Sequence, residues 1–182
     1  MTARPGSASA LLVIDMQVGV MAGCVDADGT LGRAYALVER ARGAGVPVIW
    51  VQDEQDFPRH DPDWKLAAPL AVRPGETRIF KAYRDAFADT ELSDVLTAGR
   101  TTRLFLAGAQ SDYCVRTAGQ SAAARGYDVT LIADAHTTWD ADLDGVTIPG
   151  AAIVAHTNSY FAGLRYPGQV FTVEPHHTVE LR

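Results

Sequence analysis

Lysine is almost absent from this chain, which also lacks the clustered basic residues and long apolar runs of nucleic-acid-binding and membrane proteins. Its 182 residues include fourteen arginines but two lysines, Lys65 and Lys81, and the net charge is −6. Binding to nucleic acids or anionic membranes needs a clustered basic surface, so we expect neither partner. The longest apolar stretches span about eight residues, far fewer than the roughly 20 that cross a bilayer.

Cysteine is scarce as well, and several common motifs are missing. Two cysteines, Cys24 and Cys114, could pair, but the first residues, MTARPGSASA, contain no hydrophobic signal core. We therefore expect a cytoplasmic protein without a disulfide. No G-x-S-x-G elbow, G-x-G-x-x-G fingerprint or P-loop follows a strand-like run. Their absence argues against a serine hydrolase and a nucleotide-binding protein.

What is present is ordinary globular composition, with 47% hydrophobic and 21% charged residues. The length fits a single domain over residues 1–182. Short apolar runs predict strands at 10–15, 46–52, 77–81, 102–109, 127–134 and 169–173. Helical spacing predicts helices at 31–45, 90–100, 114–125 and 146–164, the second capped by Asp89 or Thr90. The polar segments 53–64 and 136–145 predict loops.

This alternation of strands and helices predicts an α/β fold, with a mostly parallel sheet covered by helices on both faces. Ligand sites in such sheets lie at the carboxyl ends of the strands, where the strand order reverses. Asp15 ends the first predicted strand, Lys81 ends the third, and Cys114 opens the helix after the fourth. We expect these three reactive side chains to lie at the same edge of the sheet.

Cys114 has the position of a nucleophile. A thiol in the first turn of a helix lies at the positive end of the helix dipole, which favours the thiolate. The same turn offers backbone N–H groups that can form an oxyanion hole. The alternative is a buried structural cysteine. The strand-to-helix turn at the ligand edge favours the functional interpretation.

Asp15 and Lys81 suit supporting roles. Partial desolvation after four apolar residues would raise the pKa of Asp15 toward that of a general base, although the residue could instead cap a loop or pair with an arginine. An ammonium at Lys81 would stabilise a thiolate and the anion of a tetrahedral intermediate. An isolated lysine can also simply extend to solvent.

Four phrases in the same order resemble the isochorismatase-like cysteine hydrolases, a superfamily that includes nicotinamidases and N-carbamoylsarcosine amidases. The phrases are LLVIDMQVG, FKAYRDAFADTEL, LFLAGAQSDYCVRTAGQSAAARGYDVTLIADA and AIVAHTNSYFA. The likeness covers nearly the whole chain. It implies a Rossmann-like three-layer α/β/α sandwich with a six-stranded, mostly parallel sheet, assembled as homodimers or larger homo-oligomers.

The resemblance also implies a catalytic triad of Asp15, Lys81 and Cys114. The peptide between Ala109 and Gln110 would be cis, and the N–H groups of Gln110 and Cys114 would form the oxyanion hole. The implied reaction is hydrolysis of a C–N bond in an amide, lactam or ureido group through a Cys114 thioester. Asp15 would be the general acid and base, Lys81 would stabilise charge, and no cofactor would be needed.

One departure from the family concerns metal binding. Nicotinamidases carry a metal site with an aspartate and two histidines after the second strand. Asp53 fits the first ligand, but Gln55 stands where the first histidine would be, and glutamine is a poor ligand for zinc-like ions. His60, a lone histidine in a loop, is more often a solvated surface residue. We therefore expect no metal, and nicotinamide becomes a less favoured substrate.

Several residues around the predicted site are candidates for substrate binding. An acidic segment after the second strand could attract a cationic substrate, or it could be an ordinary solvated loop. Aromatic side chains could form flat apolar walls or serve in packing, and one glutamine could orient substrate or bond the backbone. The candidates are Gln17, Asp53, Glu54, Asp56, Trp64, Tyr113 and Trp139.

An acidic rim fits a cationic cyclic amide. Within the resembled family, small lactam hydrolases open the streptolidine lactam of the polycationic antibiotic streptothricin, which makes that lactam a candidate substrate. Two alternatives remain open: a catalytically idle family member that binds a small ligand, and a redox sensor built on Cys114. A redox sensor needs a nearby resolving thiol, and Cys24 is poorly placed for this in the sequence.

Overall fold

The computed structural model describes residues 8–182, so the first seven residues of the predicted domain lie outside the described part. Its main sheet has six strands in the order β3-β2-β1-β4-β5-β8, and every neighbouring pair is parallel. The strands are β1 (Ala8–Ile14), β2 (Val48–Asp53), β3 (Thr77–Lys81), β4 (Thr101–Ala109), β5 (Asp128–Thr137) and β8 (Phe171–Glu174). The strand order reverses between β1 and β4.

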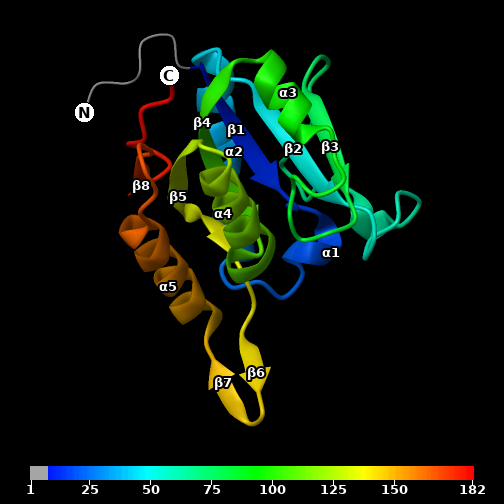
Figure 1. The fold of residues 1–182 in the computed structure, drawn as a ribbon. Helices are drawn as coiled ribbons and strands as arrows, with labels where there is room; N and C mark the ends of the chain where they lie inside the picture. The colour runs from blue at the N-terminus through cyan, green and yellow to red at the C-terminus, as the bar shows by residue number, and fades with distance from the viewer. Residues whose placement is uncertain (1–7) are drawn as a thin grey trace.

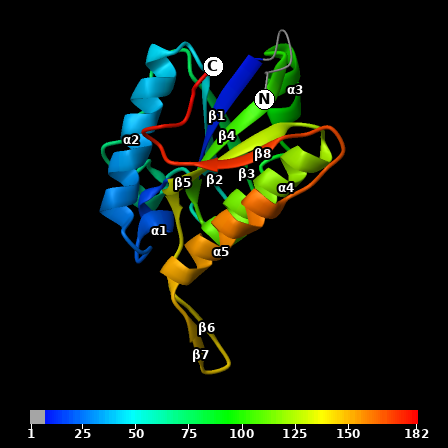
Figure 2. The same ribbon diagram turned by 90° about the vertical axis from the view of Figure 1, so that its left-hand side faces the viewer.

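Helices cover both faces of this sheet, which confirms the predicted three-layer α/β/α sandwich. Figures 1 and 2 show α2 on one face, with α3, α4 and α5 on the other. The helices are α1 (Val18–Met21), α2 (Ala27–Gly43), α3 (Leu92–Ala98), α4 (Arg116–Ala124) and α5 (Gly150–Gly163). Within residues 8–182, none of them is both long enough and apolar enough to cross a membrane.

The two faces of the sheet have separate hydrophobic cores because side chains along a strand alternate in direction. In β1, Leu11 and Val13 pack with residues of α2, whereas Leu12 and Ile14 pack with residues of α3 and α4. All four side chains are at most 1% exposed. The central strands are therefore continuous apolar runs, as expected for strands buried on both sides.

The predicted helix at 146–164 is partly wrong. Val146–Ile148 forms β7, which pairs antiparallel with β6 (Ala141–Leu143), and the helix begins at Gly150 after Pro149. Asp144 and Gly145, the residues that join the two strands, have φ angles of 53° and 82°. Positive φ at both central residues is typical of a type I′ hairpin turn, for which Asp-Gly is a preferred sequence. That dipeptide was the signal that could have predicted the hairpin.

Smaller differences concern the ends of other elements. Helix α2 begins at Ala27, four residues earlier than expected. The N-cap position of α3 is Glu91, although the Thr90 hydroxyl accepts a hydrogen bond from the Leu92 N–H at 3.3 Å. Cys114 lies in a π-helical turn, Ser111–Val115, and the regular helix α4 follows it. The nucleophile candidate therefore precedes the α-helix, where we expected it to open that helix.

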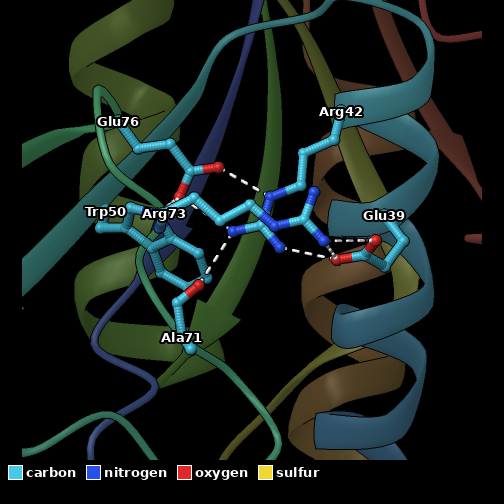
Figure 3. A network of polar contacts seen from close by, with 6 residues as sticks. All are labelled: Glu39, Arg42, Trp50, Ala71, Arg73 and Glu76. Atoms are coloured by element: carbon cyan, nitrogen blue, oxygen red, sulfur yellow. Dashed lines mark hydrogen bonds and ion pairs between the residues drawn. The ribbon is translucent and has the colours of Figure 1, made fainter.

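A network of charged side chains fixes the segment that leads into β3 (Figure 3). The Glu76 carboxylate accepts hydrogen bonds from Arg42 Nε at 2.7 Å, from Trp50 Nε1 at 2.7 Å and from the Arg73 N–H at 2.8 Å. Burial acts to raise the pKa of Glu76, but these hydrogen bonds outweigh it and lower the pKa to about 2. Since β3 begins directly after Glu76, the network holds the strand that ends at Lys81.

We expect Glu76→Gln to lower the free energy of unfolding by about 3 kcal/mol at pH 7, because lowering the pKa of a glutamate from 4.5 to about 2 corresponds to that much stability. The pKa of the folded form lies below that of free glutamate, so this contribution is complete above about pH 4.5 and is lost as the pH falls through about 2. Urea unfolding should show a smaller difference in the free energy of unfolding between variant and wild type at pH 3 than at pH 7.

A matched control is Glu54→Gln. Glu54 pairs with Arg59, and their side chains are 32% and 57% exposed. Such exposed pairs contribute at most about 1 kcal/mol. An equal loss for Glu76→Gln at both pH values would contradict the assignment of the stability to the charged network.

Candidate active site

The structure brings Asp15, Lys81 and Cys114 together at the carboxyl edge of the sheet. Lys81 Nζ lies 2.7 Å from Asp15 Oδ2 and 3.5 Å from Cys114 Sγ. It also lies 3.5 Å from Asp53 Oδ2, at the end of β2. Asp15 is 1% exposed and Lys81 is 2% exposed, whereas Cys114 is half-buried. One buried ammonium therefore contacts two carboxylates and the thiol.

The backbone around β1 and β4 makes this meeting possible. Asp15 leaves β1 with a φ of 48°, and its N–H donates to the Val51 carbonyl at 2.8 Å. Gly108 has a φ of 143°, and a Cβ at that position would collide with the carbonyl of Ile14. Only glycine lets β4 approach β1 this closely. The peptide between Ala109 and Gln110 is cis, as the family resemblance implied.

Asp15 uses its two carboxylate oxygens differently. Oδ2 is paired with the Lys81 ammonium, while Oδ1 is buried and has no hydrogen-bond partner among residues 8–182. Burial raises the pKa of Asp15 to about 6, although the attraction of Lys81 opposes this rise. A buried oxygen without a partner, on a carboxyl that titrates near neutral pH, is suited to accept and return a proton.

The thiol of Cys114 has the opposite charge state to the one the sequence suggested. Burial, followed by the charge of Asp15, raises its pKa to about 12. Lys81 lowers that pKa but does not offset both effects. Burial also acts to lower the pKa of Lys81, but the charges of Asp15, Cys114 and Asp53, together with the hydrogen bond to Asp15, more than offset burial, so the pKa is raised and the ammonium stays charged. At neutral pH the site therefore contains a neutral Cys114 thiol, a charged Lys81 ammonium and an ionised Asp15 carboxylate.

A chain of buried and partly buried polar groups supports the turn that carries Cys114. Asn158 Nδ2 donates to the Ala133 carbonyl at 2.9 Å, so its Oδ1 accepts from His136 Nε2 at 3.0 Å. His136 Nδ1 is then an acceptor and receives the Ser111 hydroxyl proton at 2.8 Å. Burial lowers the pKa of His136, which keeps the ring neutral. Sequence reasoning gave His136 no role, because its partners come from distant segments.

A pocket of about 200 Å³ opens beside the triad. Of the predicted substrate contacts, Asp53, Asp56, Tyr113 and Trp139 line it, together with Asp15 and Cys114. The remaining lining residues are Val20, Phe57, Arg84 and Gln110. Arg84 was missed, although it lies in the same quoted phrase as Lys81 and only three residues later. Its guanidinium stacks 3.9 Å from the centre of the Tyr113 ring.

Three predicted substrate contacts lie outside this pocket. Gln17 is fully buried, and its side-chain amide donates to the Asp53 carbonyl at 2.9 Å and accepts from the Asp53 N–H at 2.7 Å. Glu54 pairs with Arg59, and Trp64 stacks against Phe80. Gln17 therefore serves the backbone, and the other two side chains serve packing and surface charge. Periodicity places a residue near a strand end but cannot tell where its side chain points.

Asp53, which corresponds to the first metal ligand of nicotinamidases, is held by hydrogen bonds and an ion pair within this chain. Asp53 Oδ1 accepts the N–H groups of Gln55 and Asp56 at 3.1 and 2.8 Å, and its Oδ2 lies near Lys81. Among residues 8–182, one group of at least three histidine, cysteine or carboxylate side chains has its ligand atoms within 4.8 Å of one another, namely Asp134, His176 and His177, and none of these lines the pocket. His176 Nδ1 is 2.7 Å from Asp134 Oδ2, a pair that ties the C-terminal segment to β5.

Comparisons with known proteins agree with this architecture. A family model, the isochorismatase domain, matches residues 9–148. Two streptothricin hydrolases of Streptomyces noursei are 39% and 35% identical over 139 and 156 residues, covering 72% and 81% of this chain. The alignments cover 55% and 54% of those proteins, so the chain spans about half the length of these curated relatives. The structure of an isochorismatase from Pseudomonas putida KT2440 superimposes with a TM-score of 0.86, at 25% identity over 98% of this chain and 94% of that one.

We expect Asp15→Asn to raise the rate at which iodoacetamide alkylates Cys114 at pH 8 by at least about threefold, because it removes a charge that raises the pKa of the thiol. Lys81→Met should lower the rate, since the ammonium is the group that favours the thiolate. Mass spectrometry across pH 6–10 measures both rates.

Cys24 provides an internal reference in this experiment. Its thiol is 7% exposed, and burial raises its pKa to about 11, so it should stay unmodified. Rapid alkylation of wild-type Cys114 at pH 6 would contradict a neutral resting thiol.

Proposed function

Because this chain belongs to the isochorismatase family, we propose that it is a cysteine-dependent hydrolase of a C–N bond in a small molecule. The observation that carries this proposal is the buried ammonium of Lys81 in contact with both Asp15 and Cys114 beside a pocket. The chemistry of the site supports acyl transfer, since a nucleophile, a proton acceptor and a fixed positive charge lie within reach of one another.

The first half of the proposed reaction forms a thioester. Asp15 Oδ1 takes the proton of the Cys114 thiol as the sulfur attacks the carbonyl carbon, and the carbonyl oxygen becomes an oxyanion. The N–H groups of Gln110 and Cys114 stabilise that oxyanion. The tetrahedral intermediate then collapses, the C–N bond breaks, and the leaving nitrogen takes the proton from Asp15.

The second half releases the acid. Asp15, ionised again, takes a proton from water as the water oxygen attacks the thioester carbon. The C–S bond breaks, the sulfur recovers the proton from Asp15, and a carboxylic or carbamic acid leaves the site. Asp15 thus moves one proton in each direction in each half-reaction, which suits a carboxyl whose pKa is raised to about 6.

Lys81 supports both steps without exchanging a proton. Its raised pKa keeps the ammonium charged while negative charge moves between Asp15 and the sulfur. A fixed cation between two sites that alternate in charge stabilises whichever one is anionic. Asp53, also 3.5 Å from Lys81 Nζ, adds a second carboxylate that holds the ammonium in place.

We expect kcat/KM for a hydrolysed amide to rise with pH through about 6 and then level off, because Asp15 must be ionised to accept the thiol proton. Cys114→Ser should lower kcat by at least about 10³-fold. Assays on amides, ureas and lactams, with mass spectrometry of quenched reactions to detect an acyl adduct on Cys114, test both expectations.

The same measurements separate the proposal from its alternatives. A catalytically idle protein would hydrolyse none of these compounds. A redox sensor would instead form a reversible oxidised species at Cys114 under mild peroxide. Hydrolysis that persists in Cys114→Ser, or that does not change between pH 5 and pH 7, would contradict the thioester mechanism.

For the substrate, we propose a cationic cyclic amide, with the streptothricin lactam as the first candidate. The two Streptomyces noursei relatives are streptothricin hydrolases, and the pocket wall includes Asp53 and Asp56. The Asp53 carboxylate pairs with Lys81 and accepts hydrogen bonds from two backbone N–H groups. The Asp56 carboxylate makes no hydrogen bond or ion pair with another side chain among residues 8–182. Asp56 is therefore the carboxylate that can pair with a cation on the substrate, and Arg84 on the same wall limits where that cation can lie.

We expect Asp56→Asn to raise KM for a cationic lactam about 3- to 10-fold, because one partly solvated ion pair is worth about 1 kcal/mol. The KM of an uncharged amide of similar size should not change. Glu54→Gln is the matched control, since Glu54 lies on the same loop but outside the pocket. An uncharged aromatic amide that is hydrolysed faster than every cationic lactam would overturn the substrate assignment.

A further inference from the structure

We propose that Asp134, His176 and His177 form a binding site for a single divalent transition-metal ion of the zinc type. One ligand atom of each residue lies within 4.8 Å of those of the other two. None of the three residues lines the pocket, and none belongs to the loop that follows β2. The site is therefore separate from the triad and from the segment that holds the metal in nicotinamidases.

The three side chains come from two neighbouring strands. Asp134 lies in the second half of β5, and the two histidines follow β8, which pairs in parallel with β5. After β8 the chain makes a turn in which the Pro175 carbonyl accepts hydrogen bonds from the N–H groups of Thr178 and Val179 at 3.2 and 3.1 Å. This turn holds both histidines beside the end of β5.

Hydrogen bonds to α2 fix the backbone of the site. Figure 2 shows the segment after β8 running from the sheet toward α2. From that helix, Arg40 donates to the carbonyl groups of His176 and Val179, and Arg33 donates to the carbonyl of Asp134. Both arginines bind backbone oxygens here, so neither occupies a ligand atom of the three side chains.

Two of the ligands are already oriented toward each other. The Asp134 carboxylate accepts the His176 N–H through Oδ1 at 2.8 Å, and its Oδ2 lies 2.7 Å from His176 Nδ1. One ion can bind both of these atoms, because zinc-type ions bind nitrogen and carboxylate oxygen at about 2.0–2.2 Å. The ion would take the place of the proton between the two atoms, and the neutral His176 ring would then carry its proton on Nε2.

His177 completes the set of ligands. Its ring meets that of His176 edge to face, with the ring centres 5.2 Å apart, and the residue is exposed. Its ring nitrogens make no hydrogen bond with another residue among residues 8–182. Ligand atoms around a tetrahedral ion lie about 3.4 Å apart, so rotation of the His177 side chain has to move its nitrogen by at most about 1.4 Å.

The donor atoms indicate the class of ion. Two imidazoles and one carboxylate suit Zn²⁺, Ni²⁺ and Cu²⁺, whereas Ca²⁺ and Mg²⁺ prefer oxygen ligands alone. The net charge of −6 favours the approach of any cation. A bound ion would join the turn after β8 to β5, and Val179 of that turn is 1% exposed and packs in the core with residues of α2. Binding should therefore stabilise the fold.

Isothermal titration calorimetry with zinc chloride tests the proposal, on the full chain without a histidine tag after removal of metals with EDTA. We expect one Zn²⁺ per chain with a Kd below about 50 µM, and no binding of Ca²⁺ at the same concentrations. His177→Ala and Asp134→Asn should each raise the Kd at least about tenfold, because each variant removes one ligand.

Three matched variants exclude other places for the ion. His60→Ala and His156→Ala each remove an exposed histidine elsewhere on the chain, and His60 lies in the loop that corresponds to the nicotinamidase metal site. Cys114→Ser removes the thiol of the pocket. All three variants should bind Zn²⁺ with the affinity of the wild type.

Thermal unfolding gives a second measurement. Zn²⁺ at about 100 times its Kd should raise the Tm of the wild type by about 5–10 °C, and should raise that of His177→Ala at most about half as much. The far-ultraviolet circular dichroism spectra of His177→Ala and Asp134→Asn in EDTA should match that of the wild type, which shows that lost binding is not lost folding.

Several outcomes would overturn the proposal. A Kd above about 50 µM would show that the three side chains do not form a site. The same holds for Ca²⁺ that binds as tightly as Zn²⁺, and for a zinc affinity that survives both His177→Ala and Asp134→Asn. Loss of binding in His60→Ala or Cys114→Ser would place the ion elsewhere. None of these measurements uses catalytic turnover, so their failure is distinguishable from failure of the proposed hydrolase.

Discussion

The ion pair between Lys81 and Asp15 is the constraint on which the rest of the site depends. Both groups are almost completely buried, and a buried charge without a partner is strongly destabilising. The 2.7 Å contact lets both remain inside the protein. The same burial that requires the pair also raises the pKa of Asp15 and of the Cys114 thiol. Stability and reactivity at this edge of the sheet therefore have one physical cause.

The sheet topology places other reactive groups beside that ion pair. Lys81 ends β3, Asp53 ends β2, Asp15 follows β1 and Cys114 follows β4, so four neighbouring strands each deliver one group to the same edge. The order reverses between β1 and β4, and the diverging connections there leave room for a pocket. Gly108 allows these two strands their close approach, and the hydrogen bonds of Glu76 with Arg42, Trp50 and Arg73 hold the start of β3. Groups distant from the pocket thus help to fix its geometry.

The sequence predicted the parts of this arrangement that follow from local pattern. Buried strands are visible as apolar runs, and the carboxyl-end rule places Asp15, Lys81 and Cys114 together without any knowledge of their contacts.

Properties that depend on three-dimensional surroundings could not be predicted in the same way. The charge state of Cys114 depends on how deeply the sulfur is buried and on the nearby Asp15, and the position of the residue beside a helix shows neither of these. Gln17 bonds the backbone, which is one of the two roles that the sequence left open, and Arg84 was missed, because strand spacing does not give side-chain direction. The hairpin was hidden because the apolar residues of β7 run into those of α5, although Asp144-Gly145 marked the turn.

A neutral thiol beside an ionised carboxyl has a consequence for when the site becomes reactive. Without an acyl carbon to attack, moving the proton from Cys114 to Asp15 creates a buried thiolate that burial disfavours. When a carbonyl is in place, the same proton transfer ends with the negative charge on an oxyanion that backbone N–H groups can stabilise, and Lys81 stays charged throughout. Attack and proton transfer are then expected to proceed together. In the mechanism that we propose, a correctly bound carbonyl, more than the intrinsic acidity of the thiol, determines when the nucleophile forms.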